Sequence, residues 1–419
     1  MPAVNKDRLQ EKIHCFAQFG AEEHGGITRL SLSPAALAAR TELTKRCHAL
    51  GLFVETDDIG NIYATKTGTE TLPRIAMGSH IDSVINGGNY DGTLGVLTAL
   101  EVVETLVREN ISTRHPVTVM VWTNEEGARF APAMMASGVL TGKFSKDAML
   151  AVQDEDGVSF GQALLAGDCL GKTDNRLNPQ DYLAYLELHV EQGPVLANEN
   201  LTIGVVRGVV GMCNYTVTAH GQANHAGTTP MQERKDALYA ASQCVCTLYE
   251  RLGRIDPDLV FTFGHIACRP NIHTIIPDEV RFSLDARHQE PAILQEVVKI
   301  VRALPAQTAN CAISVEEAWS RKSTLFDPKL VALVKKNADA LGFPNRHLYS
   351  GAGHDAQYVQ DILPSAMIFV PSEGGLSHCA KENTSIDDCI CGADVLLHTL
   401  LDLDAEDTSI RDRYLSVGE

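Results

Sequence analysis

Residues 78–91 read GSHIDSVINGGNYD, and this stretch decides the fold class. The apolar run 74–77 before it predicts a short buried strand, and the periodic apolar residues after it predict a helix. His80, Asp82 and Asp91 should therefore lie in the loop that leaves the carboxyl end of a strand, where open α/β sheets bind their ligands. A neutral imidazole and two ionised carboxylates are ligands that a borderline-soft divalent cation takes.

Three further segments repeat this arrangement of an apolar run with histidine or acid at its end. The strand predicted at 117–123 ends just before Glu125 and Glu126, two adjacent carboxylates whose mutual repulsion a bound metal would relieve. His189 and His378 each lie in or just after another apolar run. The chain has 15 histidines, so one of them alone would mean little, but the recurrence predicts a metal site.

Together these motifs resemble the M20 metallopeptidase-like amidohydrolases, over about residues 25–403. Within that family the chain is most similar to the hydantoinase/carbamoylase branch, which contains N-carbamoyl-L-amino acid hydrolases, β-ureidopropionases and allantoate amidohydrolases. The motifs that carry the resemblance are HxD at 80–82, NGGxYDGxLG at 86–95, the EE pair, ELHxEQG at 187–193, NHAGTTPM at 224–231, GAGHDA at 351–356 and GxSH at 375–378.

The resemblance implies two divalent metal ions per subunit, either Zn²⁺ or Mn²⁺/Co²⁺. One ion would be held by His80 and His189, the other by Glu126 and His378, and Asp91 would bridge the two. Histidine and carboxylate ligands without cysteine suit these three metals.

The remaining acids of these motifs would act beside the metals. Glu125 is implied as the general base that takes a proton from water, and Asp82 as the carboxylate that orients the imidazole of His80. Two alternatives stay open for the acidic pair: both Glu125 and Glu126 are ligands, or their order is reversed.

The chain is expected to be α/β, with a discontinuous catalytic domain and an inserted domain. Across 212–325 the strand and helix patterns follow the order β-α-β-β-α-β, which is the ferredoxin-like arrangement. One of the strands predicted in this insert covers residues 259–266. The catalytic domain would comprise 1–211 and 326–419, with a mixed central sheet, and the α+β insert would serve as a lid or dimerisation domain.

By resemblance, polar residues of the insert complete the site. His225 would stabilise the oxyanion of the tetrahedral intermediate from a neighbouring subunit, which implies a homodimer, and Arg287 would grip the substrate carboxylate with its planar fork. Further substrate contacts are expected from Asn271, Thr274, Gln192 and His354. The family usually reads PNxxNxIP at 270–277, and here Thr274 replaces the second Asn, which puts in doubt the usual recognition of an α-carboxylate.

The implied activity is hydrolysis of the carbamoyl group of an N-carbamoyl-L-amino acid or a related ureido acid, with release of CO₂ and ammonia. Alternatives are an amidohydrolase of the allantoate or ureidoglycolate type, an M20 dipeptidase or aminopeptidase with the same site, and a binding protein that retains the fold without catalysis.

Composition sets wider limits. A net charge of −18 argues against nucleic acid and anionic membrane surfaces as partners, and no apolar run reaches the length of a membrane span. The first residues contain no secretory signal pattern, and the 11 cysteines are an odd number scattered singly, so we expect reduced thiols in a cytoplasmic protein. The pairs Cys244/Cys246 and Cys389/Cys391 are expected to be buried thiols rather than metal ligands.

Overall fold

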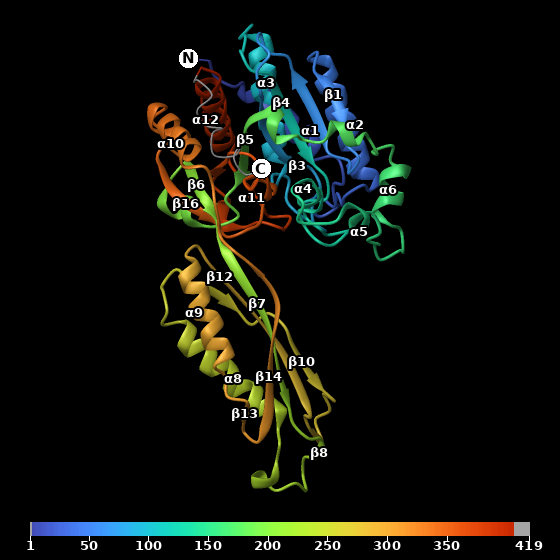
Figure 1. Ribbon diagram of the computed structural model, residues 1–419, viewed down its shortest axis with the longest axis vertical. Coiled ribbons are helices and arrows are strands. Elements are labelled where there is room, and N and C mark those ends of the chain that lie inside the picture. Colours follow the sequence, from blue (N-terminus) through green and yellow to red (C-terminus); the bar gives the residue numbers. More distant parts are fainter. Residues whose placement is uncertain (1, 406–419) are drawn as a thin grey trace. The chain divides into compact units, whose positions relative to one another are not determined.

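The chain folds into two compact units, described in a computed structural model over residues 2–405 (Figure 1). The larger unit comprises Met1–Gly208 and Leu325–Glu419, and the smaller one comprises Val209–Thr324. The boundaries expected from the sequence, 211/212 and 325/326, lie within three residues of these limits. Each unit is described separately below.

The larger unit is built on a nine-stranded mixed sheet in the order β1-β2-β4-β3-β5-β17-β6-β15, with β16 paired to β6. Its centre is parallel: β3 lies between β4 and β5, and β5 also pairs with β17. The strands are β1 Phe53–Thr56, β2 Ile62–Lys66, β3 Arg74–His80, β4 Val117–Trp122, β5 Tyr182–Val190, β6 Ile203–Val209, β15 Thr324–Leu325, β16 Asn345–Ser350 and β17 Ser365–Val370. This confirms the predicted α/β fold with a mixed central sheet.

Burial explains why the central strands read as unbroken apolar runs. Every residue of β4, β5 and β17 is buried, as expected for parallel strands covered on both faces. Helices α3 and α12 pack on the central strands and on each other, and α1 and α10 pack on them in turn. The helices of this unit are α1 Lys6–Phe16, α2 Pro34–Ala49, α3 Thr93–Arg108, α4 Met135–Leu140, α5 Lys146–Leu150, α6 Phe160–Ala166, α7 Val195–Glu199, α10 Pro328–Ala340, α11 Asp355–Val359 and α12 Ile386–Ala405.

The smaller unit has ferredoxin-like topology. Its four long strands lie in the antiparallel order β10-β12-β7-β14, and helices α8 and α9 pack together over this sheet. Helix α9 shows why: Leu294, Val297 and Val301 are its buried residues and share one helical face. The elements are β7 Gly211–His220, β8 Asn224–His225, α8 Ala237–Leu252, β9 Val260–Thr262, β10 Ile266–Arg269, β11 Ile275–Ile276, β12 Glu279–His288, α9 Pro291–Arg302, β13 Gln307–Thr308 and β14 Cys311–Arg321.

Three expectations from the sequence are corrected. Strand β3 does not stop at residue 77 but continues to His80, because residues 78–80 still pair with β4. The single strand expected at 259–266 is two strands: β9 pairs with residues 285–287 of β12, and β10 with residues 279–282. Residues 263–265, which include Gly264, interrupt the strand between β9 and β10.

The third correction concerns the cysteines. Cys244 and Cys389 are buried as expected, but Cys246 is exposed and Cys391 is half-buried. Residues two apart on a helix point in different directions, so only one of each pair can face the core. All eleven cysteines are free thiols.

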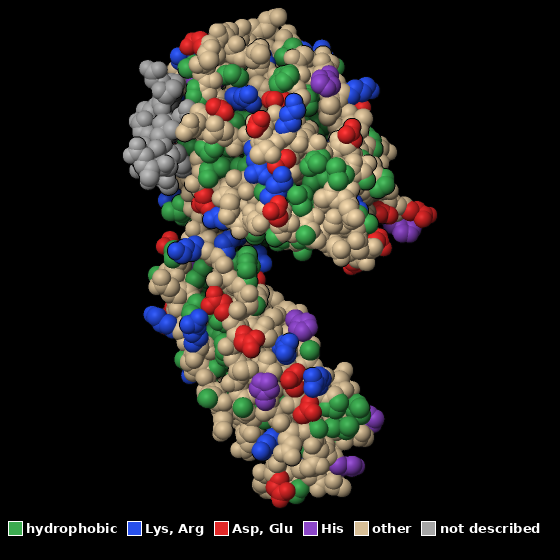
Figure 2. Space-filling view, turned by 45° about the vertical axis from the view of Figure 1, so that its right-hand side comes forward, with side chains coloured by type: hydrophobic (Ala, Val, Ile, Leu, Met, Phe, Trp, Pro, Cys, Tyr) green, Lys and Arg blue, Asp and Glu red, His purple; other side chains and the backbone are tan. Residues whose placement is uncertain are grey.

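Two features bear on possible partners, the distribution of charged side chains and the apolar length of the helices. On the face drawn in Figure 2, acidic and basic side chains are interspersed over both units. None of the helices within residues 2–405 has both the length and the apolar character needed to cross a bilayer.

Candidate active site

The predicted metal ligands of the larger unit meet at one edge of its sheet. His80 ends β3, Glu125 and Glu126 follow β4, and His189 lies near the end of β5. Because these three strands are parallel neighbours, their carboxyl ends share one edge. The loops before α3 and after β17 bring Asp91 and His378 to the same place.

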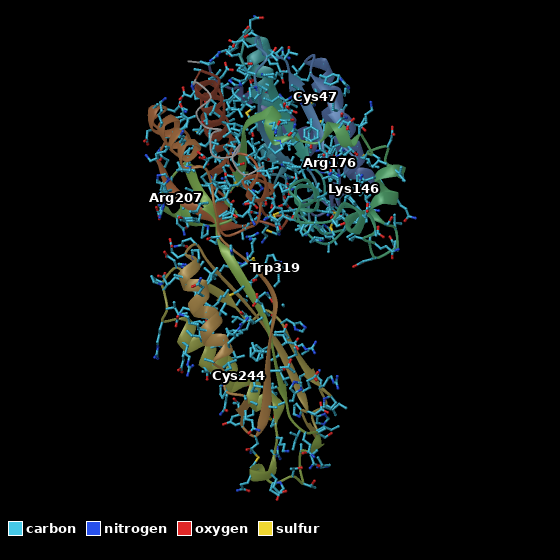
Figure 3. All side chains as sticks on the ribbon, viewed as in Figure 1. Cys47, Lys146, Arg176, Arg207, Cys244 and Trp319 are labelled. Carbon is cyan, nitrogen blue, oxygen red and sulfur yellow. The ribbon has the colours of Figure 1, made fainter. Side chains whose placement is uncertain are left out.

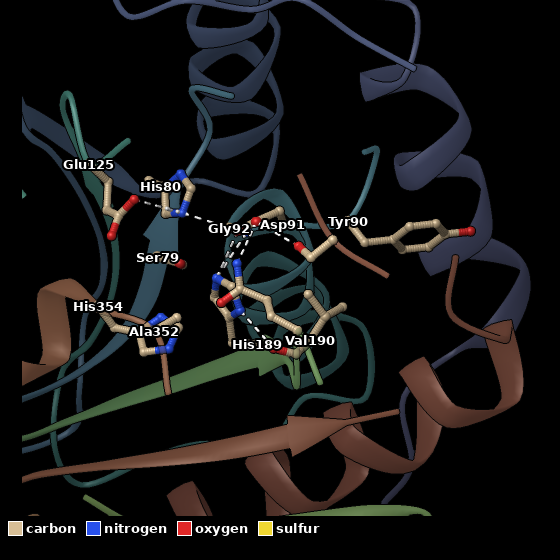
Figure 4. Close-up of polar contacts among 12 residues, drawn as sticks. Ser79, His80, Tyr90, Asp91, Gly92, Glu125, His189, Val190, Ala352 and His354 are labelled. Atoms are coloured by element: carbon tan, nitrogen blue, oxygen red, sulfur yellow. Dashed lines mark hydrogen bonds and ion pairs between the residues drawn. The ribbon is translucent and has the colours of Figure 1, made fainter. Parts of the chain in front are cut away.

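Asp91 is the centre of this cluster. Its Oδ1 lies 3.6 Å from Nε2 of His80 and 3.2 Å from Nε2 of His189 (Figure 4), while its Oδ2 lies 3.1 Å from Nε2 of His378. Glu126 Oε2 is 3.5 Å from Nε2 of His378. Three groups have ligand spacing among the described residues. Two of them, His80–Asp91–His189 and Asp91–Glu126–His378, share Asp91, and the third is Glu187–His189–His354.

Backbone carbonyls fix the tautomers of the two buried imidazoles. Nδ1 of His80 lies 3.0 Å from the carbonyl oxygen of Asp82, and Nδ1 of His189 lies 2.9 Å from that of Val190 (Figure 4). A neutral ring that donates from Nδ1 keeps the lone pair of Nε2, and in both rings Nε2 faces Asp91. A metal-binding histidine needs this lone pair, which in His189 accepts the N–H of Gly92 at 3.1 Å and would have to turn to a bound cation instead.

Oxygen atoms at the cluster also lack partners. Among the described residues, Glu126 Oε1 and Gln192 Oε1 are buried without a hydrogen bond. A buried oxygen without a donor is costly, and a cation would satisfy it. The nitrogen and oxygen donors, with no thiolate among them, fit two divalent ions of the Zn²⁺, Mn²⁺ or Co²⁺ type.

The electrostatics show how much negative charge the site concentrates. Burial raises the pKa of Glu125 well above its usual value, and the neighbouring carboxylates of Asp355, Glu126 and Asp82 add to the rise. Burial and the charge of Asp91 raise the pKa of Glu126 to about 7. Bound cations would reverse these shifts, because they favour the ionised carboxylates.

The pKa values of Asp91 and His378 shift so that both side chains favour their charged forms, because the two contact each other. Burial opposes ionisation of Asp91, but contacts with His189, His378 and His80 outweigh burial and hold its pKa well below the usual range. The contact with Asp91 raises the pKa of His378 to about 9. The side chain of His378 is 50% exposed, so the cluster opens to solvent on this side.

The position of Asp82 corrects one detail of the sequence interpretation. Its carboxylate Oδ1 is 3.7 Å from Nδ1 of His80, farther than its own carbonyl oxygen. The carboxylate instead accepts the backbone N–H groups of Glu125 at 3.3 Å and Glu126 at 3.2 Å. Asp82 therefore ties the loop after β3 to the loop after β4, and its carbonyl group orients the imidazole.

Two buried acids at the site had no role in the sequence interpretation. Glu382 accepts the N–H groups of Tyr90 and Asp91, each at 3.0 Å, and the hydroxyl of Ser377 at 2.7 Å. Glu187 accepts hydrogen bonds from Ser79 and Tyr185 beneath the imidazoles. Glu187 could have been found because it precedes His189 by two residues on one strand and so points to the same face.

The structure also locates the two substrate contacts expected in the larger unit. Gln192 donates to Asp91 Oδ2 at 2.7 Å, so its amide borders the cluster. His354 is buried, with its Nε2 2.8 Å from Ser350 Oγ and its ring 4.6 Å from that of His189. The ring of His354 therefore packs against that of His189. Contact of His354 with substrate stays a prediction.

The other expected contacts lie at two separate places in the smaller unit, the two-stranded sheet β8–β11 and the six-stranded sheet. His225 in β8 pairs with Ile275 in β11, and the carbonyl of Thr274 accepts the N–H of Ala226, so Thr274 and His225 lie close together. Asn271 belongs to the same β10–β11 connection.

Arg287 lies in β12 of the six-stranded sheet, near the end of that strand far from the β8–β11 sheet. It is paired with Met212 in β7 and forms an ion pair with Asp285 at 2.8 Å. Glu279, which begins β12, is paired with the last residue of β7. The eight steps along the strand from Glu279 to Arg287 rise by about 3.4 Å each, so roughly 27 Å of strand separates these two residues.

The mixed sheet with histidines and carboxylates at its strand ends defines a metal-binding hydrolase of the metallopeptidase type. The chain belongs to peptidase family M20/M25/M40, whose sequence profile matches residues 76–402.

Among its relatives, the chain is 37% identical to the N-carbamoyl-L-amino-acid amidohydrolase of Paenarthrobacter aurescens, over 95% of this chain and 98% of that protein. It is 36% identical to the allantoate amidohydrolase of Escherichia coli K12, over 95% and 98% respectively. A solved amidase of the hydantoinase/carbamoylase family from Burkholderia multivorans superposes with a TM-score of 0.88 at 37% identity, covering 97% of this chain and 99% of that one.

Proposed function

We propose that this protein is an amidohydrolase that hydrolyses the carbamoyl C–N bond of an N-carbamoyl-L-amino acid or a related ureido acid. The overall reaction converts the substrate and water into the free amino acid, CO₂ and ammonia. The observation that carries the proposal is the shared position of Asp91 between two ligand groups, with Glu125 beside them. The amidohydrolase relatives of the same length support the linear amide as substrate class.

His80, His189 and Asp91 would hold one divalent ion, and Asp91, Glu126 and His378 the other. When bound, two such ions would make water more acidic and polarise the substrate carbonyl group. Zn²⁺, Mn²⁺ and Co²⁺ all fit the donor set.

Glu125 would act as the general base. It belongs to neither of the two ligand groups that share Asp91, yet its Oε2 lies 3.5 Å from Nε2 of His80. Its carboxylate would take the proton of the attacking water and pass it to the leaving nitrogen, and the carbamic acid that leaves would break down to CO₂ and ammonia.

His225 would donate a hydrogen bond to the developing oxyanion. The N–H of Gly227 donates to Nδ1 of His225 at 3.0 Å, which leaves the proton of a neutral ring on Nε2, free to donate. Arg287 would bind the substrate carboxylate. The β8–β11 sheet that holds His225 adjoins the start of β12, whereas Arg287 lies near the far end of this long strand. The two residues of one chain cannot both reach one small substrate, and we propose a homodimer in which His225 of the partner subunit completes each site.

A mixing experiment tests this homodimer. E125Q and H225A proteins are each expected to be inactive, and dimers that contain one copy of each would have one site with both native residues. After subunit exchange, roughly a quarter of all sites should regain activity. If His225 acts within its own chain, no activity returns. A mixture of E125Q with D91N is the matched control, because both changes lie in the larger unit and no complete site can form.

The substrate remains to be chosen among three classes. A screen that measures ammonia release from N-carbamoyl-L-amino acids, allantoate and ureidoglycolate, and release of free amino acids from dipeptides, separates the carbamoylase from the allantoate-type and peptidase alternatives, with metal content measured in parallel. Inertness of the fully loaded protein toward every amide would overturn the proposal. We place this enzyme in the cytoplasm, where its eleven free thiols would stay reduced.

A further inference from the structure

Arg29 is a fully buried arginine next to the metal edge of the sheet. It lies in the connection between α1 and α2, and its relative exposure is 0%. Its guanidinium group donates to four acceptors: the carbonyl of Ile81 at 2.5 Å, the hydroxyl of Thr93 at 2.6 Å, and the carbonyls of Phe16 at 2.7 Å and Phe19 at 3.2 Å. The planar guanidinium group of Arg29 therefore donates hydrogen bonds to the end of α1, to the loop after β3 and to the start of α3.

These acceptors flank the metal ligands in the sequence. Ile81 stands between His80 and Asp82, and Thr93 is the first residue of α3, two residues after Asp91. The backbone of Arg29 adds a second connection, because its N–H donates to Ser83 Oγ at 2.9 Å and its carbonyl accepts the N–H of Ser83 at 3.0 Å.

The charge of Arg29 has no acidic partner of its own. Within residues 2–405 it forms no ion pair, and all four acceptors of its side chain are neutral groups. Burial lowers the pKa of Arg29 to about 10, and Asp82 opposes this shift, so the group stays protonated at neutral pH. An unpaired buried cation is costly, and a chain that needed only packing here would use an apolar side chain.

We propose that Arg29 is a positioning residue for the metal centre, which sets the separation of His80 from Asp91 and thereby the affinity of the His80–Asp91–His189 group for its cation. The inference rests on the metal ligation proposed above. A guanidinium group suits this task because its donors are fixed in one plane, so it holds several backbone segments at defined distances. Its positive charge also offsets part of the excess negative charge of the surrounding carboxylates.

The test compares R29M and R29K with the wild type by titration of the metal-free proteins with Co²⁺, whose visible spectrum reports ligand geometry. We expect Co²⁺ binding to weaken about 10- to 100-fold in R29M, as for other residues that orient metal ligands. R29K keeps the charge but cannot donate to all four acceptors, so we expect an intermediate affinity and an altered spectrum. Excess Co²⁺ should restore most of the lost kcat in both variants.

The matched control is K12M, which removes another buried cation of the larger unit. Lys12 pairs with Glu101 and Glu104, away from the metal ligands. K12M should lower the melting temperature without changing Co²⁺ affinity or spectrum. If R29M is too unstable to purify, R29K carries the test alone.

Each result is decisive for one of the two proposals. Wild-type affinity and spectrum in folded R29M or R29K, or an equal loss of affinity in K12M, would overturn the role of Arg29 and leave the metal site intact. If the wild-type protein itself binds no divalent cation, the proposed function fails first.

Discussion

The metal edge of the larger unit and the β8–β11 end of the smaller unit differ in how their polar groups are held. At the metal edge, His80, His189 and Asp91 are almost fully buried and contact several fixed partners. At the β8–β11 end, His225 and Thr274 are exposed, and the hydrogen bonds of His225 are made within its own segment, with Asn224 and Gly227. The first region is arranged within one unit, whereas the second presents exposed side chains, which fits the proposal that His225 acts on the site of a partner subunit.

This contrast indicates a division of labour. A cation demands donor atoms at fixed distances, which only a packed and hydrogen-bonded framework supplies. Substrate recognition tolerates, and for turnover requires, groups that approach and withdraw. The following predictions would sharpen this comparison or break it, and they run from the largest expected effect to the smallest.

Asp91→Asn should have the largest effect. An asparagine side chain is neutral and has only one oxygen, so it cannot give one carboxylate oxygen to each of the two ligand groups that share Asp91. Both cations should therefore be lost. Activity should fall by more than the roughly 10⁴-fold that a single acid–base residue contributes. Metal analysis and ammonia release measure the two losses. Asp58→Asn, in the same unit but away from the cluster, should retain metal and activity. Full metal content in D91N would refute the bridging role.

Glu125→Gln should retain both cations and lose catalysis. Because the amide cannot take a proton from water, kcat should fall about 10²- to 10⁴-fold while KM changes little. Glu126→Gln is the matched control and should lose metal instead. Retained turnover in E125Q with normal metal content would assign the base elsewhere, and loss of metal in E125Q would favour the alternative in which both glutamates are ligands.

Arg287→Lys should affect binding more than chemistry. A lysine keeps the charge but loses the two-pronged contact, so KM for a carboxylate-bearing substrate should rise roughly 10- to 100-fold with a smaller change in kcat. Arg269, another arginine of the same sheet, serves as the control, since its contact is with Glu279 on the neighbouring strand. An unchanged KM in R287K would mean that the substrate carboxylate is recognised by another group.

Asp58→Asn should have the smallest effect, on stability alone. Lys146 and Arg176, labelled in Figure 3, both bind this carboxylate, and Thr173 donates to it at 2.9 Å. Burial alone would raise the pKa of Asp58, but the hydrogen bonds from Arg176, Lys146 and Thr173 outweigh it and lower the pKa from 3.8 to about 2.

A pKa that is lower in the folded state means that the stabilisation is complete above about pH 4 and is lost as pH falls toward 2. We therefore expect D58N to be about 1–2 kcal/mol less stable than the wild type at pH 7. The difference in melting temperature should shrink as the pH is lowered from 5 to 2. A difference that is independent of pH would show that the ion pairs contribute nothing at this site.

Much of the fold could be predicted because its elements carry local patterns. The buried parallel strands read as apolar runs, and the amphipathic helix α9 has the spacing of a one-sided core face. The split between β9 and β10 was missed because the strand-like composition of residues 259–266 does not reveal which part of β12 each half pairs with. The exposure of Cys246 was missed because the face of a helix that meets the core depends on the tertiary packing.

The candidate site likewise has features that the sequence predicts and features that it does not. By itself the sequence determined the ligand types and their order, since histidines and acids at the ends of apolar runs form a pattern along the chain. Only the tertiary structure decided that Asp91 lies between three imidazoles, that the carboxylate of Asp82 holds the loop of Glu125, and that Arg29 joins two ligand loops. These relations connect residues dozens of positions apart, and a hydrogen bond depends on distance in space, which sequence separation does not fix.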